Sequence, residues 1–165
     1  MSEGDSKNVK KIFLLALFIF IPSIGMADSN SETVYIIPVE NEVERGLEAF
    51  LKRSIREAEK QKADRIILEI HTPGGFVHAA GNIAHLLRKT KIQTTAFIKK
   101  DALSAGAYIA LNADEIVMAP GSRIGSAAII DQEGNMADEK MRSAWLADMK
   151  ASAELNGRDP LYALA

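Results

Sequence analysis

The chain has 165 residues, 47% of them hydrophobic, which is enough for one domain with a substantial core. Its formal net charge of −2 gives no electrostatic reason to expect nucleic-acid binding, and its lysines and arginines are spread along helical stretches as on solvated faces. The sequence contains no cysteine, which excludes disulfide bonds, thiolate metal ligands and a cysteine nucleophile.

The N-terminal segment has the order of features found in a secretory signal. Three lysines precede an apolar run, 12–21, and a small-residue ending follows at Ala27. The run is shorter than the roughly 20 residues of a spanning helix. We therefore expect residues 1–27 to be a signal peptide, with a retained membrane anchor as the alternative. Residues 28–32 then form a polar linker, and the rest of the chain lies outside the cytoplasm.

Beyond residue 32, segments with strand composition alternate with segments of helical spacing. Apolar and β-branched runs predict strands at 33–39, 64–70, 94–98 and 115–118. Helical spacing predicts helices at 41–58, 76–89, 104–113 and 138–155, with an irregular or extended segment at 121–130. Short connections between alternating strands and helices favour an α/β domain built on a largely parallel sheet.

Two unusual turns follow predicted strands, where α/β sheets place their sites. The first is "HTPGG" at 71–75, whose glycines leave backbone amides exposed for stabilising negative charge; an ordinary turn into a helix is the alternative. The second is "DALSAG" at 101–106, which places Ser104 between small residues at a helix start. Ser104 is either a nucleophile or a helix N-cap, and the residues alone leave both open.

A serine nucleophile needs a base. His78 and His85 fall on the polar face of a predicted helix, and His71 belongs to the first turn, so no histidine is supported. A lysine can act as a base when it is neutral, a state that burial or a nearby cation favours. Lys140 is the best candidate, because we expect the apolar face of the last predicted helix to hold it toward the core. A surface lysine at a helix start is the alternative.

The chain resembles the ClpP-class membrane serine proteases of the NfeD family in two stretches, "LEIHTPGG" and "ALSAGAYIALNADEIVMAPGSRIGSA", followed by a lysine that enters a helix. The similarity runs from about Val34 to the C-terminus. It implies a ClpP/crotonase-like fold of repeated strand-strand-helix units. It also implies a catalytic dyad, with Ser104 as the nucleophile and Lys140 as the base.

The same resemblance assigns the rest of the site. The amides of Gly74 and Ala105 match the oxyanion hole, and Gly75 with Phe76 borders the substrate groove. Residues 33–165 are then a ClpP-like serine protease domain. We expect that domain to be incomplete at its C-terminus, because Asp159-Pro160 has the pattern of a helix start shortly before the sequence ends.

The function implied is an extracytoplasmic, membrane-associated serine endopeptidase. Its substrates would be apolar peptide segments, notably the C-terminal regions of stomatin-like membrane proteins, and the protein would be a homo-oligomer. No metal or organic cofactor is called for. Three alternatives stay open: a non-catalytic membrane-associated scaffold of the same fold, a signal-peptide-peptidase-like protease, and crotonase-like acyl-CoA chemistry. The secretory signal argues against the last, because acyl-CoA is a cytoplasmic substrate.

Overall fold

The computed structural model describes residues 31–129 and 135–161. The chain divides into two compact units, 1–31 and 32–165, and the described residues belong almost entirely to the second. The expected signal peptide, residues 1–27, and most of the expected linker lie outside them. Within the described ranges, no helix is both long and apolar enough to cross a membrane.

A parallel sheet organises the second unit. Its strands in the described residues are β1 (Val34–Val43), β2 (Arg65–Gly75), β3 (Gln93–Leu103), β4 (Glu115–Met118) and β5 (Arg123–Gly125). They are ordered β1-β2-β3-β4, and β5 pairs with the last residues of β3, beyond the stretch that pairs with β4. The α/β class and the parallel sheet predicted from the sequence are confirmed.

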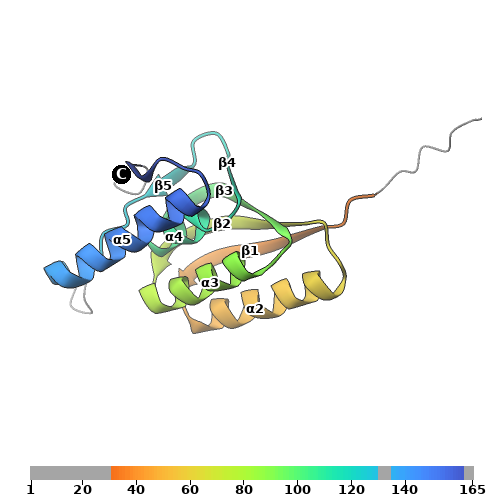
Figure 1. Cartoon of the computed structure of the whole chain (residues 1–165), viewed down its shortest axis with the longest axis horizontal. Coiled ribbons are helices and arrows are strands. Elements are labelled where there is room, and N and C mark those ends of the chain that lie inside the picture. Colours follow the sequence, from red (N-terminus) through yellow and green to blue (C-terminus); the bar gives the residue numbers. More distant parts are fainter. Residues whose placement is uncertain (1–30, 130–134, 162–165) are drawn as a thin grey trace, which may run out of the picture. The chain divides into compact units, whose positions relative to one another are not determined.

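The helices are α2 (Arg45–Lys60), α3 (Val77–Lys89), α4 (Ala105–Leu111) and α5 (Glu139–Leu155). They pack in chain order, α2 beside α3, α3 beside α4 and α4 beside α5 (Figure 1). Two of them begin at side-chain caps: the Glu44 carboxylate accepts the Gly46 N–H at 2.8 Å, and the Asp138 carboxylate accepts the Met141 N–H at 2.8 Å. Polar caps thus fix where α2 and α5 start.

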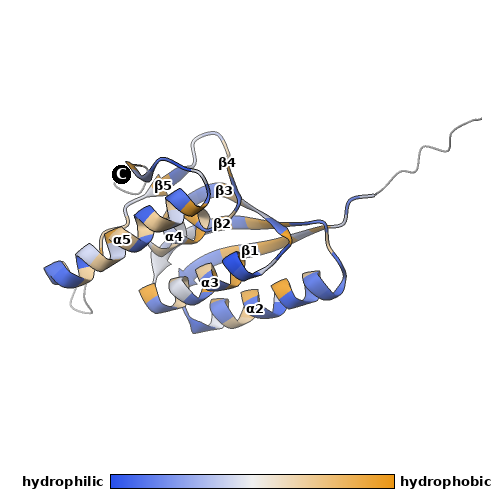
Figure 2. Ribbon diagram, in the orientation of Figure 1, coloured by the Kyte–Doolittle hydropathy of each residue, from blue (hydrophilic) through white to orange (hydrophobic). Residues whose placement is uncertain are grey.

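The core lies between the sheet and these helices. Along β2 the side chains alternate, with Ile66, Leu68 and Ile70 fully buried and the residues between them only partly buried. The helices meet the buried face with their own apolar residues, such as Leu51 and Ile83, and α2 carries both hydrophobic and hydrophilic residues, as a helix with one packed side should (Figure 2).

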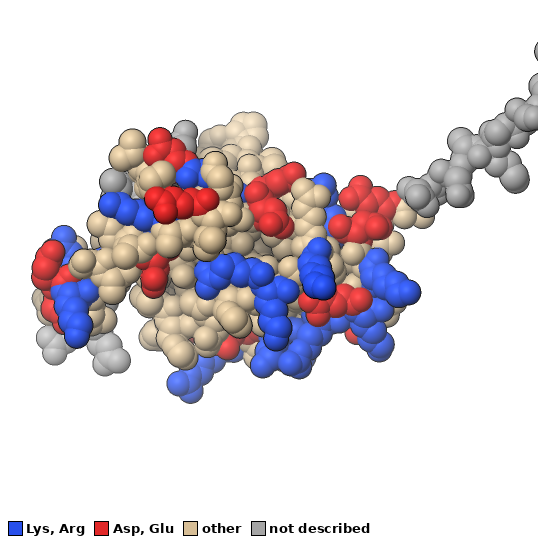
Figure 3. All heavy atoms as spheres, in the orientation of Figure 1, with Lys and Arg blue, Asp and Glu red and all other residues tan. Residues whose placement is uncertain are grey.

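Basic side chains collect on the outer surface of α2 and α3 (Figure 3). Among the described residues, no ion pair involves either helix; the six pairs lie on the strands, on α5 and at Glu32. Apart from Arg88, whose guanidinium donates to Asn112 Oδ1, these lysines and arginines are solvated, as their helical spacing predicted.

Three strands extend further at their carboxyl ends than the sequence predicted. β1 continues to Val43, although a helix was expected from Asn41. β2 includes "HTPGG", expected as a turn, and β3 runs to Leu103 instead of ending at Ile98. These residues have little intrinsic strand preference. They are extended because pairing with a neighbouring strand satisfies their backbone groups.

Candidate functional site

Ser104 occupies a strained turn between β3 and α4. Its backbone φ is 52° and its ψ is −117°, a combination that costs a non-glycine residue about 1–3 kcal/mol. The Ser104 N–H donates to the Gly125 carbonyl at 2.8 Å, and its carbonyl accepts the Tyr108 N–H at 3.2 Å. Its hydroxyl makes no capping hydrogen bond to α4. Ser104 therefore stands at the N-cap position without capping the helix through its side chain. Its hydroxyl stays available, as the hydroxyl of a nucleophile at a strand-to-helix turn must.

Gly74 is pressed against this turn. A Cβ atom on Gly74 would lie 2.6 Å from Ser104 Cβ and 3.2 Å from Ser104 Oγ, and the Gly74 φ of 109° is one that side chains rarely adopt. The structure thus brings together the two turns that the sequence singled out. The Gly74 N–H, expected to serve an oxyanion, donates here to Thr72 Oγ1 at 3.1 Å.

Thr72 fastens three parts of the site, and sequence reasoning missed it. Its buried Oγ1 donates to the carbonyl of Asn41, at a bulge in β1, and accepts the Gly74 N–H. Its methyl group faces Gly106 in the first turn of α4, where an added Cβ would lie 2.4 Å from Thr72 Cγ2. Only its position before Pro-Gly-Gly could have drawn attention to it.

Ala105, the other expected oxyanion residue, is the first residue of α4 and is buried. The N–H groups of a first helical turn have no acceptor inside the helix. Since the Ser104 hydroxyl does not cap the helix, the Ala105 amide sits beside the serine as a donor without an intrahelical acceptor.

A groove of about 480 Å³ begins at Ser126, next to Gly125, whose carbonyl accepts the Ser104 N–H. Residues 126–129, which follow Gly125, form one wall, and side chains of α5 such as Trp145 and Met149 form the other. Trp145 ties the walls together, because its Nε1 donates to the Ala127 carbonyl at 2.7 Å. Its ring also packs against Tyr108 of α4, with centroids 4.6 Å apart.

This groove is a second feature that sequence reasoning missed. Gly75 and Phe76, the expected groove residues, lie at the end of β2; both are exposed, and Phe76 lines a separate hollow of about 340 Å³ beside Arg45 and His78. The structure thus offers two hollows at this edge. The one expected from the sequence is the smaller.

The expectation that Lys140 points toward the core is wrong. Lys140 is exposed at the second position of α5, and no hydrogen bond or ion pair joins it to another described residue, Ser104 included. With 3.6 residues per turn, Lys140 lies about 140° around the helix from the buried Trp145, and so faces away from the packed side. Its neighbour Glu139 lines the groove, but Lys140 itself is not among the groove-lining residues.

Two of the three histidines lie on a solvated helix face, as expected, whereas His71 lies in β2 and not in a turn. His78 and His85 are exposed on α3. His71 approaches the buried Asp101 carboxylate, with Nδ1 3.8 Å from Oδ2. Asp101 also accepts a 2.7 Å hydrogen bond from Arg123 Nε, which holds the pKa of that carboxyl below its ordinary value, against the effect of burial. This ion pair fastens β5 to β3, two residues before the Gly125 carbonyl that binds Ser104.

Residues 33–165 match the family model described as the N-terminal domain of NfeD1b. "Membrane protein NfeD1b" of Bacillus subtilis (strain 168) is 52% identical over 157 residues, covering 93% of this chain and 35% of that protein. The chain spans about a third of the length of the curated relatives it matches.

Two of the solved structures that match this chain show its fold. The 1510-N membrane-bound stomatin-specific protease of Pyrococcus horikoshii matches with a TM-score of 0.76 and 31% identity, covering 80% of this chain and 68% of that one. ClpP1 from Listeria monocytogenes matches with a TM-score of 0.63 over 78% of this chain and 75% of that one; at 20% identity it bears on the fold alone. The fold is therefore ClpP-like, and the chain belongs to the family of NfeD1b N-terminal domains.

Proposed function

We propose that this domain is the catalytic part of a membrane-associated, extracytoplasmic serine peptidase with Ser104 as nucleophile and Lys140 as base. The observation that carries the proposal is the strained turn that presents the Ser104 hydroxyl free of any helix-capping bond, with Gly74 packed against it. Similarity to a named membrane-bound protease at 31% identity supports the same reaction class.

The reaction would be acyl transfer. Ser104 Oγ attacks a peptide carbonyl carbon while its proton passes to the neutral amine of Lys140. The carbon–nitrogen bond then breaks, and the protonated lysine returns the proton to the leaving amine. Water attacks the resulting ester with Lys140 again as base, which releases the acid and restores the serine hydroxyl.

The backbone amides of Ala105 and Gly74 would stabilise the tetrahedral oxyanion. For Gly74 this requires its N–H to turn from Thr72 Oγ1 to the substrate oxygen. For Lys140 to act as the base, its exposed amine must come within hydrogen-bond reach of Ser104 Oγ when substrate binds.

The groove supports an apolar peptide as substrate. Its lining includes the apolar side chains of Ala127, Ile129, Trp145 and Met149, which suit the apolar side chains of such a peptide. We further propose that Gly75 and Phe76 border the path of the peptide, that the C-terminal regions of stomatin-like membrane proteins are substrates, and that the working form is a homo-oligomer.

Fluorophosphonate labelling of the full-length protein tests the dyad. Wild type and the controls Ser54→Ala and Lys150→Ala, which alter residues on α2 and on α5 outside the groove, should label at equal rates. Ser104→Ala should not label, and Lys140→Ala and Lys140→Arg should label far more slowly near neutral pH. Labelling that survives in Ser104→Ala would refute the serine assignment. Unchanged labelling in Lys140→Ala would assign the base elsewhere.

A partner-binding domain without catalysis is the second candidate, favoured by the exposure of Lys140, which forms no hydrogen bond or ion pair with another described residue. Such a domain would bind an apolar peptide through the same groove and would need neither side chain. Equal peptide affinity in wild type and Ser104→Ala, with no cleavage by wild type, would select this function.

A further inference from the structure

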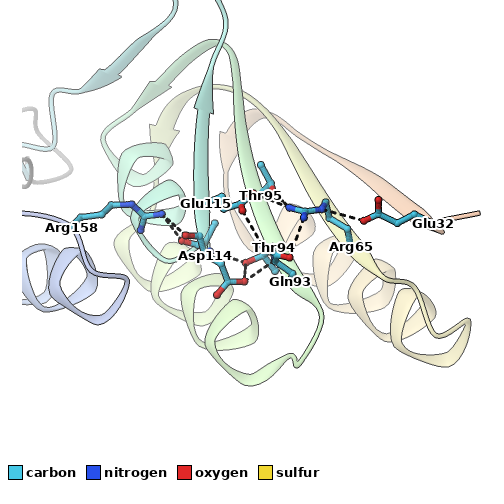
Figure 4. Close-up of polar contacts among 9 residues, drawn as sticks. Glu32, Arg65, Gln93, Thr94, Thr95, Asp114, Glu115 and Arg158 are labelled. Atoms are coloured by element: carbon cyan, nitrogen blue, oxygen red, sulfur yellow. Dashed lines mark hydrogen bonds and ion pairs between the residues drawn. The ribbon is translucent and has the colours of Figure 1, made fainter. Parts of the chain in front are cut away.

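Side chains from the segment that follows α5 donate hydrogen bonds to the C-terminal end of α4 and to the turn after it. The Arg158 guanidinium donates to three carbonyl oxygens: Leu111 at 3.0 Å, Ala113 at 2.8 Å and Asp114 at 3.0 Å. Figure 4 shows the guanidinium pointing toward Asp114. Asn156 Nδ2 donates to the same Leu111 carbonyl at 2.9 Å. We call Asn156 and Arg158 the α4 clamp.

The clamp meets a need that α4 creates. At the end of α4 the Ile109 and Ala110 carbonyls accept the backbone N–H groups of Asn112 and Ala113, which leaves the Leu111 carbonyl to the clamp. Every residue of α4 is buried, so water cannot easily serve that carbonyl. A cation at this end also interacts favourably with the helix dipole. Gly157 has a φ of 68°, which allows the chain to turn so that the side chains on both sides of it return to α4.

The opposite end of α4 carries the Ser104 turn. The helix has only seven residues, about 10 Å in length, and so short a helix is not stable by itself. A strained backbone persists only when its surroundings over-determine it. At the serine end these surroundings are the Gly125 carbonyl and the contact between Gly106 and Thr72. At the C-terminal end of α4 the surroundings that hold the helix include the clamp.

The turn that the clamp holds is also tied to the sheet. The Asp114 carboxylate accepts the N–H of Thr94 at 2.7 Å and its hydroxyl at 2.8 Å, so β3 and Arg158 hold one turn from two sides (Figure 4). A separate tie runs from Asn112 Nδ2 to Ser152 Oγ of α5 at 3.1 Å. Because these bonds do not involve the clamp, removing the clamp should loosen α4 without unfolding the domain.

We propose that Asn156 and Arg158 are positioning residues for Ser104: by fixing the far end of α4 they hold the nucleophile turn in its strained conformation. The "NGRD" motif would thus belong to the active-site machinery although it lies at the opposite end of the helix. The proposal rests on the proposed peptidase function for its effect on reactivity, but its effect on α4 can be measured independently of any activity.

The test compares Arg158→Ala, Arg158→Lys and Asn156→Ala in the full-length protein with wild type and with Arg56→Ala, a matched arginine exposed on α2. Hydrogen exchange of the amides of residues 104–111 is measured together with the midpoint of thermal unfolding. Arg158→Ala should exchange these amides about tenfold faster or more, as expected when a charge-assisted hydrogen bond is lost, with protection of β1 and β2 unchanged. The exchange rate in Arg158→Lys should lie between those of wild type and Arg158→Ala, because an ammonium group cannot match the planar fork of a guanidinium.

The second readout is the rate of fluorophosphonate labelling at a temperature where all variants are folded. Arg158→Ala should label about tenfold more slowly, and free guanidinium at low concentration should restore part of the rate, which a merely destabilised protein would not show. Unchanged exchange in α4 overturns the proposal, as does faster exchange with an unchanged labelling rate. If wild type does not label, the peptidase function fails, and the exchange of the Ser104 turn alone decides the role of the clamp.

Discussion

Gly74 and Ser104 are in contact: a Cβ atom placed on Gly74 would lie 2.6 Å from Ser104 Cβ and 3.0 Å from the Leu103 carbonyl oxygen. Neither neighbour is the end of a flexible side chain, so neither can move aside easily. Only glycine fits at position 74 while Ser104 keeps its position, so a change in one turn must affect the other.

Gly74→Ala should disable the site more than it destabilises the fold. The added methyl group must displace the Ser104 turn, and the φ of 109° is unfavourable for alanine. We expect loss of fluorophosphonate labelling, with a drop in the free energy of unfolding of about 1–3 kcal/mol, measured by urea denaturation. Gly81→Ala is the control: Gly81 lies inside α3 with open space around it, so alanine should stabilise the domain by about 1 kcal/mol. Normal labelling in Gly74→Ala would show that the turn tolerates displacement.

Gly106→Ala should destabilise the fold because its added Cβ would collide with the methyl group of Thr72. Its Cβ would lie 2.4 Å from Cγ2 of the buried Thr72. Thr72→Ser removes that methyl group and keeps the hydroxyl that bonds Gly74. In a double-mutant cycle by urea denaturation, we expect Gly106→Ala to lower the free energy of unfolding by about 1–3 kcal/mol and Thr72→Ser to restore much of it. Strictly additive effects would contradict this packing.

Several of these features could be predicted from the sequence, and others could not. Ser104 stood out because its neighbours are small, and Gly74 because two glycines follow a predicted strand. β4 was predicted with its observed bounds from its apolar run. All three signals can be seen in a few consecutive residues. The carboxyl ends of β1 and β3 were missed, because Glu42, Val43 and residues 101–103 are held in strands only through pairing with neighbouring strands. Lys140 was misplaced because the apolar side of α5 is decided by packing against α4, through Trp145.

Asp101 should make stability depend on pH in the acid range. Its hydrogen bond from Arg123 lowers its pKa in the folded state, so the unfolded state binds the proton more tightly. Its contribution to stability is therefore present above the unfolded pKa, about 3.9, and is lost as the pH falls through the lower folded value. We expect Asp101→Asn to reduce the slope of the free energy of unfolding against pH below about 4.

The matched control for Asp101→Asn is Asp148→Asn, which alters an exposed carboxylate of α5. It should leave the slope near that of wild type. Chemical denaturation at a series of pH values between about 2.5 and 7 measures both variants. An Asp101→Asn protein with the wild-type slope would show that other carboxylates govern the acid transition.

Trp145→Phe should affect the groove more than the fold. Phenylalanine keeps an aromatic ring against Tyr108 but removes the indole N–H that donates to the Ala127 carbonyl at 2.7 Å. The lost hydrogen bond should lower the free energy of unfolding by about 1 kcal/mol and free the wall formed by residues 126–129. With an apolar peptide substrate, KM should rise while kcat changes little, because the wall binds substrate without touching the reacting atoms. Trp145→Ala, which also removes the ring, should lower the free energy of unfolding by about 3–5 kcal/mol. If Trp145→Phe lowered kcat and left KM unchanged, the wall would act on the Ser104 turn through Gly125 and not on the peptide.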